Sequence, residues 1–159
     1  HLENFGGHRY AAGLTLTEDK VEAFSACFEE YVAKHITEEQ LSPQIKVDAL
    51  IEFKDITHKF FKVLKQFAPF GPGNMKPVFV SEDVKDFGFS RLVGRDQEHL
   101  KLSLVDDSSE EVMDGIAFGM HAYNDHLKSM KPLDICYTIE ENTYMGNTKI
   151  QLMIKDIKV

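Results

Sequence analysis

His99–Val105 reads HLKLSLV and alternates large apolar side chains with polar ones. Successive side chains of a β-strand point to opposite faces, so this alternation predicts a strand with one face buried. The leucines belong to the buried face, and Lys101 and Ser103 belong to the outward face. The rest of the fold is predicted by working outward from this strand.

Four further strands are predicted around it, one before and three after. Their ranges are 77–89, 112–118, 133–140 and 148–159. Residues 121–130 are expected to form a short helix between the third and fourth strands. Three strands, one helix and two strands is the order of a five-stranded, partly open OB-fold barrel. Another small barrel or a sandwich stays open, because strand count alone does not fix topology.

Residues 1–76 show a mainly helical pattern, so the predicted fold class is α+β. Residues 5–13 suggest a tight turn, one or two helical turns and a glycine cap. Apolar side chains at helical spacing predict an amphipathic helix from an N-cap at Thr17 to about residue 36. Residues 46–53 are expected to form a strand. Residues 56–68 follow as a second amphipathic helix with Asp55 as its N-cap.

The breaker cluster FGPGN at residues 70–74 follows Pro69 and ends that helix. A domain boundary is therefore predicted near residue 76. The cluster is glycine-rich but lacks the Gly-Lys-Ser/Thr ending of a phosphate-binding P-loop. Its expected role is structural, which is to fix the angle between the two domains.

The composition limits the classes of protein to which the chain can belong. With 159 residues and 43% hydrophobic content, the chain can form one ordinary domain or two small ones. No apolar run reaches the roughly 18 residues that a membrane span needs, and the opening residues do not resemble a signal peptide. Cys27 and Cys136 form no CxxC pair. Two buried free thiols in a reduced, cytoplasmic protein are favoured over a disulfide or a metal site.

The net charge of −8 argues against indiscriminate binding of nucleic acid. The charge is unevenly distributed, however. Residues 54–76 carry five lysines against one aspartate, whereas residues 77–159 carry nine basic and fifteen acidic side chains. This distribution is compatible with a local basic track on an acidic body.

Two segments together resemble one protein family. Residues 5–14, FGGHRYAAGL, resemble the GGHxxAAG signature of the DHHA1 domain, which follows the DHH catalytic domain in a superfamily of phosphoesterases. Residues 64–79, LKQFAPFGPGNMKPVF, are similar to the segment by which RecJ exonucleases pass from DHHA1 into their OB domain. Residues 134–159 also resemble the end of that OB domain, so the resemblance covers essentially the whole chain.

The resemblance implies a domain order and a function. Residues 1–76 would be the C-terminal part of a DHHA1 domain with its connecting helix and FGPGN linker, and residues 77–159 an OB-fold that binds nucleic acid. The parent enzyme would hydrolyse single-stranded DNA from the 5′ end with Mn²⁺ or Mg²⁺, in recombination and DNA repair. The DHH domain holds those metals, and its Asp-His-His run does not occur in this sequence.

This chain is therefore expected to contain no catalytic residue, no metal site and no cofactor of its own. It is expected to bind single-stranded DNA weakly and to be inactive as an enzyme by itself. The partners that the resemblance implies are single-stranded DNA, the DHH domain of the same polypeptide, single-strand-binding protein and other repair proteins. No membrane partner is expected.

Gly6, Gly7 and His8 are the first predicted binding residues. Glycines let backbone N–H groups approach a phosphate closely, and a following helix would add a favourable dipole. His8 can donate a hydrogen bond to the same anion. Arg9 is a further candidate phosphate contact, although the family signature leaves its position variable. The alternative is an ordinary Gly-Gly turn with a surface histidine.

A second set of candidates lies on the predicted barrel, since OB-folds stack bases on aromatic rings and pair phosphates with cations. The set is Phe87, Phe89, Arg91, Arg95, Lys101 and Tyr144. The alternative for the phenylalanines, which the pattern favours, is burial in the core. The alternative for the cations is a solvated face, and this is also the favoured interpretation of the lysines in residues 56–68.

Two rival functions remain. The acidic balance of residues 77–159 is compatible with an OB-type module that docks another protein of a DHH-family phosphodiesterase. His121, Asp125 and His126 could belong to a metal site in an enzyme of another kind. A polar helix face is the favoured interpretation of these three, because metal sites normally need three or four ligands with supporting groups.

Overall fold

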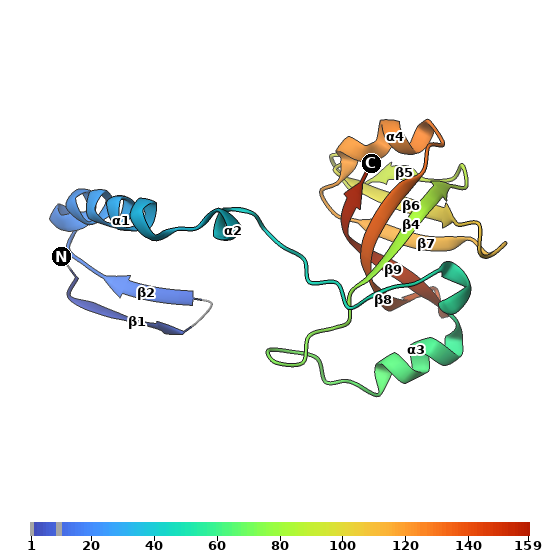
Figure 1. The fold of residues 1–159 in the computed structure, drawn as a ribbon, viewed down its shortest axis with the longest axis horizontal. Coiled ribbons are helices and arrows are strands. Elements are labelled where there is room, and N and C mark those ends of the chain that lie inside the picture. The colour runs from blue at the N-terminus through green and yellow to red at the C-terminus, as the bar shows by residue number, and fades with distance from the viewer. Residues whose placement is uncertain (1, 9–10) are drawn as a thin grey trace. The chain divides into compact units, whose positions relative to one another are not determined.

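The computed structural model describes residues 2–8 and 11–159 (Figure 1). They fall into two compact units, His1–Ile45 and Lys46–Val159. The division lies earlier than the boundary predicted near residue 76. The reason is that Phe53, Ile56 and Phe61 belong to the hydrophobic core of the second unit. The assignment of residues 1–76 to a DHHA1 domain and of residues 77–159 to an OB-fold domain stays a prediction.

The first unit is a β-hairpin followed by helices. Its elements are β1 (Asn4–His8), β2 (Ala11–Thr15), the 3-10 helix η1 (Glu18–Lys20), α1 (Val21–His35) and α2 (Glu38–Leu41). The predicted amphipathic helix is present as η1 and α1, but the Thr17 side chain makes no capping hydrogen bond. None of the described residues in this unit is buried, and Phe28 and Tyr31 on α1 are 56% and 63% exposed.

The turn and short helix predicted for residues 5–13 are wrong, because residues 5–8 lie on β1 and residues 11–13 lie on β2, and the two strands pair. Gly6 pairs with Gly13 and Gly7 with Ala12 in antiparallel register. A Cβ on Gly7 would lie 2.7 Å from the backbone of Ala11 and Ala12, so the close approach of the two strands requires glycine there. Gly-Gly-His therefore lies along a strand, and the helix dipole invoked for it is absent from this segment.

The second unit is built on one sheet. Its strands are β3 (Ala49–Leu50), β4 (Phe79–Asp86), β5 (Arg91–Val93), β6 (His99–Val105), β7 (Met113–Ala117), β8 (Leu133–Tyr144) and β9 (Asn147–Lys158). The strand order is β3-β4-β8-β9-β7-β6-β5, and β4 also pairs with β6. The pairings of β4, β8, β9, β7 and β6 therefore form a continuous ring, visible as the curled sheet in Figure 1.

The sequence alternation predicted the inner face of this sheet correctly. Leu100, Leu102 and Leu104 on β6 are fully buried, as are Val84 on β4 and Leu152 on β9. The short helix predicted between the third and fourth strands is present as the 3-10 helix η3 (His121–Tyr123) and α4 (Asn124–Lys128), and Leu127 of α4 is buried. The strand β5 was not predicted.

A buried hydrogen bond ties the segment before β4 to the sheet. The hydroxyl groups of Ser81 on β4 and Tyr137 on β8 lie 2.7 Å apart. Ser81 Oγ also donates to the carbonyl oxygen of Ile51 at 2.7 Å. Both side chains are buried, and the Tyr137 hydroxyl depends on Ser81 as its hydrogen-bond partner.

The secondary structure of residues 46–76 differs from the elements predicted for them. The strand expected over 46–53 is shortened to β3, because Phe53 turns into the core in the 3-10 helix η2 (Phe53–Asp55). The following helix is α3 (His58–Lys65), and its N-cap is Thr57, whose Oγ1 accepts a hydrogen bond from the backbone N–H of Phe60. Asp55 instead accepts a hydrogen bond from the backbone N–H of Glu52 within η2.

The FGPGN cluster forms a closed turn inside the second unit. Gly71 and Asn74 exchange two backbone hydrogen bonds of 2.9 Å. The Asn74 side chain donates to the carbonyl oxygens of Phe67 and Pro69. The cluster therefore does not lie between the two compact units, where its predicted angle-setting role would place it.

Both cysteines are free, as predicted, but Cys27 is exposed rather than buried, and Cys136 is half-buried. Cys27 is exposed because the described residues of its unit form no buried core. No helix in the described ranges is long and apolar enough to cross a membrane.

Candidate nucleic-acid interface

The outward face of β6 carries two neighbouring cations. Lys101 lies on the face opposite the buried leucines, and Arg91 on β5 is its direct cross-strand partner. Within residues 2–8 and 11–159, neither side chain forms an ion pair. Like charges at directly opposed positions destabilise a strand pair. An anion bound at this position would relieve that repulsion.

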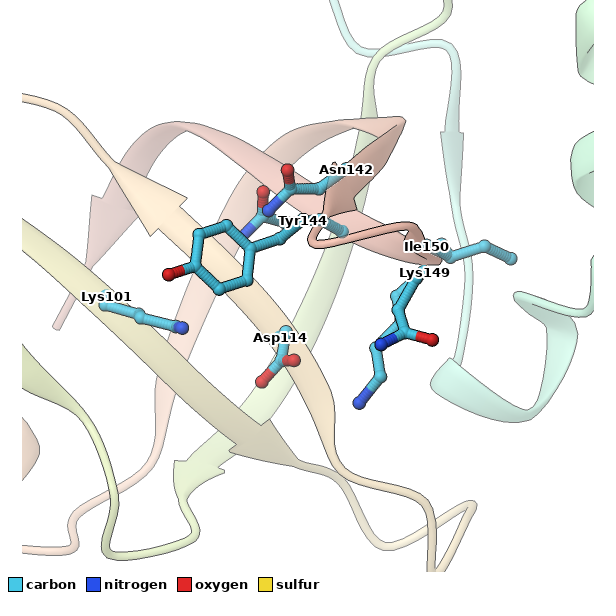
Figure 2. Close-up of a pocket in the computed structure, with 8 residues that line it drawn as sticks. Lys101, Asp114, Asn142, Tyr144, Lys149 and Ile150 are labelled. Atoms are coloured by element: carbon cyan, nitrogen blue, oxygen red, sulfur yellow. The ribbon is translucent and has the colours of Figure 1, made fainter.

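A pocket of about 380 Å³ opens beside Lys101 (Figure 2). Strands β6, β7, β8 and β9 supply its lining. The lining residues are Lys101, Asp114, Asn142, Tyr144, Asn147, Lys149, Ile150 and Gln151. The pocket therefore combines two cations, one carboxylate, three amides and one exposed aromatic ring.

The β8–β9 hairpin positions Tyr144 at this pocket. The last strand pair is Tyr144 with Asn147, and the two residues between them have positive φ angles, 48° at Met145 and 80° at Gly146. Positive φ at both turn residues is the signature of a type I′ hairpin turn. Tyr144 is 70% exposed. Its ring lies above Lys101 and Asp114 in the view of Figure 2.

Phe87 and Phe89 form an exposed aromatic pair between β4 and β5. Their side chains are 49% and 67% exposed, and their ring centroids lie 5.8 Å apart. The burial that the pattern favoured for them is therefore wrong. Gly88 between them has a φ of 99°, a conformation that residues with a side chain rarely adopt. The chain bends at Gly88 between β4 and β5, and both rings remain at the surface.

Hydrogen bonds anchor this aromatic pair to β6. The buried carboxylate of Asp86 accepts from the Ser90 hydroxyl at 2.5 Å and from the Ser90 backbone N–H at 3.3 Å. The Ser90 hydroxyl in turn accepts from the backbone N–H of Ser103 at 3.0 Å. The Phe87 backbone N–H donates to the Ser103 carbonyl oxygen at 2.9 Å. The two rings therefore extend from a loop that is fixed at both ends.

The remaining cations of the second unit divide into two groups. Arg95 is exposed in the loop between β5 and β6. Lys65 pairs with Glu141 at 2.7 Å, and Lys76 pairs with Glu140 at 2.6 Å. Acidic side chains of β8 thus neutralise part of the basic stretch 54–76. The predicted solvated face agrees with the exposure of Lys59 and Lys62.

Gly6, Gly7 and His8 belong to the first unit, where all three are exposed on β1. Arg9 lies outside the described residues. This set therefore belongs to a different unit from the candidates on the sheet. Phosphate binding by these four residues stays a prediction.

The structure brings Arg91, Lys101 and Tyr144 of the predicted set to one face and adds residues that were not predicted. The additions are Asp114, Asn142, Asn147, Lys149 and Gln151. The alternation of residues 148–159 already placed Lys149 and Gln151 opposite the buried Ile154 and Leu152. Asn142 could not be found in that way, because β8 was expected to end at residue 140.

Comparison with known proteins matches residues 47–156 to the family model described as the RecJ OB domain. The single-stranded-DNA-specific exonuclease RecJ of Haemophilus influenzae is 29% identical over 155 residues, which cover 97% of this chain and 26% of that protein. The protein of the same name from Bacillus subtilis is 29% identical over 160 residues, covering 99% of this chain and 20% of that protein. The chain thus spans about a quarter or less of the length of these relatives.

A solved structure of RecJ from Thermus thermophilus, in complex with Mn²⁺, matches with a TM-score of 0.73 at 22% identity. The match covers 99% of this chain and 22% of that chain. A second structure of that protein, in complex with Mg²⁺, matches with a TM-score of 0.71 at 23% identity. At this level of identity the likeness shows a shared fold.

Proposed function

This chain belongs to the RecJ OB domain family, and from that membership we propose that it is the part of a RecJ-type exonuclease that holds single-stranded DNA. The proposed contact surface is the outward face of β6 and β7, flanked by the loop that carries Phe87 and Phe89 and by the β8–β9 hairpin. OB-folds bind oligonucleotides on this strand face and between the corresponding loops.

We interpret the ring of strand pairings as the five-stranded barrel of an OB-fold. In chain order the ring uses β4, β6, β7, β8 and β9, with α4 between the third and fourth of them. This is the strand and helix order of that fold. The short β5 pairs antiparallel with the same edge of β6 as the end of β4 does, so it continues the line of the first barrel strand. It places Arg91 beside Lys101.

The observation that carries the proposal is the unpaired cation couple on this face. Arg91 and Lys101 repel each other at opposed positions, and neither has an acidic partner in the described part of the chain. A DNA phosphate between them would neutralise both. Elsewhere on the unit, Lys65, Lys76 and Lys158 are paired with carboxylates. The couple thus offers a phosphate positive charge that no carboxylate of the described residues already neutralises.

Aromatic side chains would supply a second set of contacts with the DNA, in addition to the phosphate contacts. Phe87, Phe89 and Tyr144 are exposed at the surface of a unit that buries many of its other large side chains in a core. Stacking a base on an aromatic ring contributes about 1–3 kcal/mol and tolerates any sequence. Three such rings beside two cations match the requirements of a single strand, whose bases are free to stack.

The remaining proposals concern the parent protein. We propose that it degrades single-stranded DNA from the 5′ end, in recombination and repair in the cytoplasm, with the first unit as the end of its DHHA1 domain. Mn²⁺ or Mg²⁺ would be held by its DHH domain. No group of three or more His, Cys, Asp or Glu in the described residues could hold a metal ion. Proteins of the repair machinery, including single-strand-binding protein, are further proposed partners.

A second candidate function is docking of another protein. An apolar pocket of about 300 Å³ lies between α3 and the sheet, lined among others by Phe61, Phe70 and Ile139. The acidic balance of residues 77–159 also favours a protein partner over a polyanion. The two functions predict different responses to salt at the β6–β7 face, because only phosphate contacts release the counterions of a polyanion.

Fluorescence anisotropy with a labelled 5′-phosphorylated single strand, beside its duplex, tests the proposal at two salt concentrations. We expect preferential binding of the single strand that weakens as salt rises. Absence of binding at low salt would contradict the proposal and leave docking as the better function. The same samples, incubated with Mn²⁺, are expected to show no cleavage of the strand by this chain.

A further inference from the structure

A carboxylate occupies the middle of the proposed DNA face. Asp114 lies on β7 directly opposite Ser103, and it lines the pocket beside Lys101 and Lys149. Its side chain is half-buried, and within the described residues it accepts no hydrogen bond and forms no ion pair. A carboxylate repels phosphate, so it would weaken DNA binding at a surface that contacts only the DNA backbone.

Among the described residues, no neighbour of Asp114 forms an ion pair with it. Lys101 is paired with Ile116, so Lys101 and Asp114 occupy diagonal positions on the two strands. Diagonal neighbours are about 7–8 Å apart at their backbones, within reach of a lysine. No ion pair within 4.0 Å joins them in the part of the chain that the structure describes. The carboxylate therefore remains available to an incoming hydrogen-bond donor.

The other polar groups of the pocket suit a neutral ring with polar edges. Asn142, Asn147 and Gln151 each offer an amide that can both donate and accept hydrogen bonds. The ring of Tyr144 supplies an aromatic face at the same pocket, as Figure 2 shows. An aromatic ring in one pocket with amides and a carboxylate is the set of groups that binds an unstacked nucleobase by its face and its edges.

We propose that this pocket is a nucleobase subsite in which Asp114 selects a base that carries an amino group, with cytosine preferred over thymine. The inference rests on the proposed function and names the base that its central pocket takes. Tyr144 stacks on the base, Asp114 accepts a hydrogen bond from the amino group, and Lys101 and Arg91 meet the neighbouring phosphate.

The chemistry of the two pyrimidines gives the direction of the preference. Cytosine presents the N4 amino group as a donor, whereas thymine presents the O4 oxygen as an acceptor at the same place. A carboxylate accepts from the first and repels the second. The amide of an asparagine can instead donate to O4, so Asp114→Asn is expected to remove the preference for cytosine while keeping the shape of the side chain.

The test compares two labelled strands, a thymine dodecamer and the same strand with one central cytosine, by anisotropy on the full chain at low salt. We expect the cytosine strand to bind about five- to tenfold more tightly, since base-edge contacts of this kind discriminate by about that much. The Asp114→Asn variant is expected to bind both strands equally, with no loss of affinity for the thymine strand.

Two variants separate this role from a general change of charge or fold. Glu110→Gln removes a carboxylate charge from an exposed residue outside the pocket, and it is expected to keep the preference for cytosine. Tyr144→Ala is expected to weaken binding of both strands. Equal binding of the two strands by the unmodified chain would overturn the base subsite and leave the proposed function standing. A preference that persists in Asp114→Asn would overturn the role of Asp114. Absence of binding to either strand would overturn both proposals.

Discussion

Arg91 on β5 and Lys101 on β6 are direct cross-strand partners, so two cations face outward side by side with no ion-pair partner in the described residues. This arrangement costs stability and supplies a place for an anion. Binding surfaces often retain such unfavourable contacts, because the ligand relieves them.

Removing that repulsion is expected to stabilise the folded chain. Lys101→Glu places opposite charges at the paired positions, and the gain in the free energy of unfolding is expected to be about 0.2–1 kcal/mol. Urea unfolding followed by circular dichroism measures the change. Lys155→Glu, at an exposed residue near the far end of β9, is the matched control and is expected to give no comparable gain. A Lys101→Glu variant less stable than the unmodified chain would contradict the repulsion.

The aromatic pair is expected to contribute to binding without contributing to stability. Phe87→Ala and Phe89→Ala each remove one exposed ring, and each is expected to cost about 1–3 kcal/mol of binding free energy for a single strand. The salt dependence of binding stays the same, because no phosphate contact is lost. Phe67→Ala removes a similarly exposed ring outside this loop and serves as the control in the anisotropy assay. Equal losses from all three variants would argue against a specific stacking role.

The Ser81–Tyr137 hydrogen bond predicts an unequal response to its two deletions. Ser81→Ala leaves the buried Tyr137 hydroxyl without its partner, and the expected loss in free energy of unfolding is about 1–3 kcal/mol. Tyr137→Phe leaves Ser81 its bond to the Ile51 carbonyl oxygen, so a smaller loss of about 1 kcal/mol is expected. Tyr123→Phe, which alters a hydroxyl without a hydrogen bond in the described residues, is the control in urea unfolding.

The same tyrosine predicts a loss of stability at high pH. Burial raises the pKa of Tyr137, although the hydrogen bond with Ser81 opposes the shift. The folded chain therefore binds the phenolic proton more tightly than the unfolded chain. Its stabilising contribution is complete below the unfolded pKa of about 10 and is lost as the pH rises above it. The difference in unfolding free energy between the unmodified chain and Tyr137→Phe is expected to shrink from pH 9 to pH 11. A constant difference would contradict the shift.

Periodicity predicted the elements whose side chains alternate over a full strand. His99–Val105 has the predicted bounds, and the strands predicted over 112–118 and 148–159 differ from β7 and β9 by about one residue at each end. Periodicity did not find β5, because three residues are too few to show an alternation. It also ended β8 early, since residues 141–144 are polar and exposed and are held as strand by pairing with β9.

The candidate site was predicted in part for the same reason. Lys101 follows from the alternation of its own strand, but its neighbour Arg91 depends on pairing between two strands, which no local pattern reveals. Gly7 shows the opposite problem, since a glycine pair suggests a turn locally while the β1–β2 pairing places it in a strand. Asp114 is a site residue only because the fold brings it into one pocket with Tyr144 of the β8–β9 hairpin, which no local pattern reveals.

The most direct measurement is the affinity of Lys101→Glu for a labelled single strand at low salt, compared with Lys155→Glu. Both variants change the net charge equally, and only the first alters the cation couple on the β6–β7 face. We expect Lys101→Glu to bind at least about tenfold more weakly and to lose about one unit of the salt slope, with Lys155→Glu close to the unmodified chain. Equal binding by the two variants would contradict the placement of single-stranded DNA on this face.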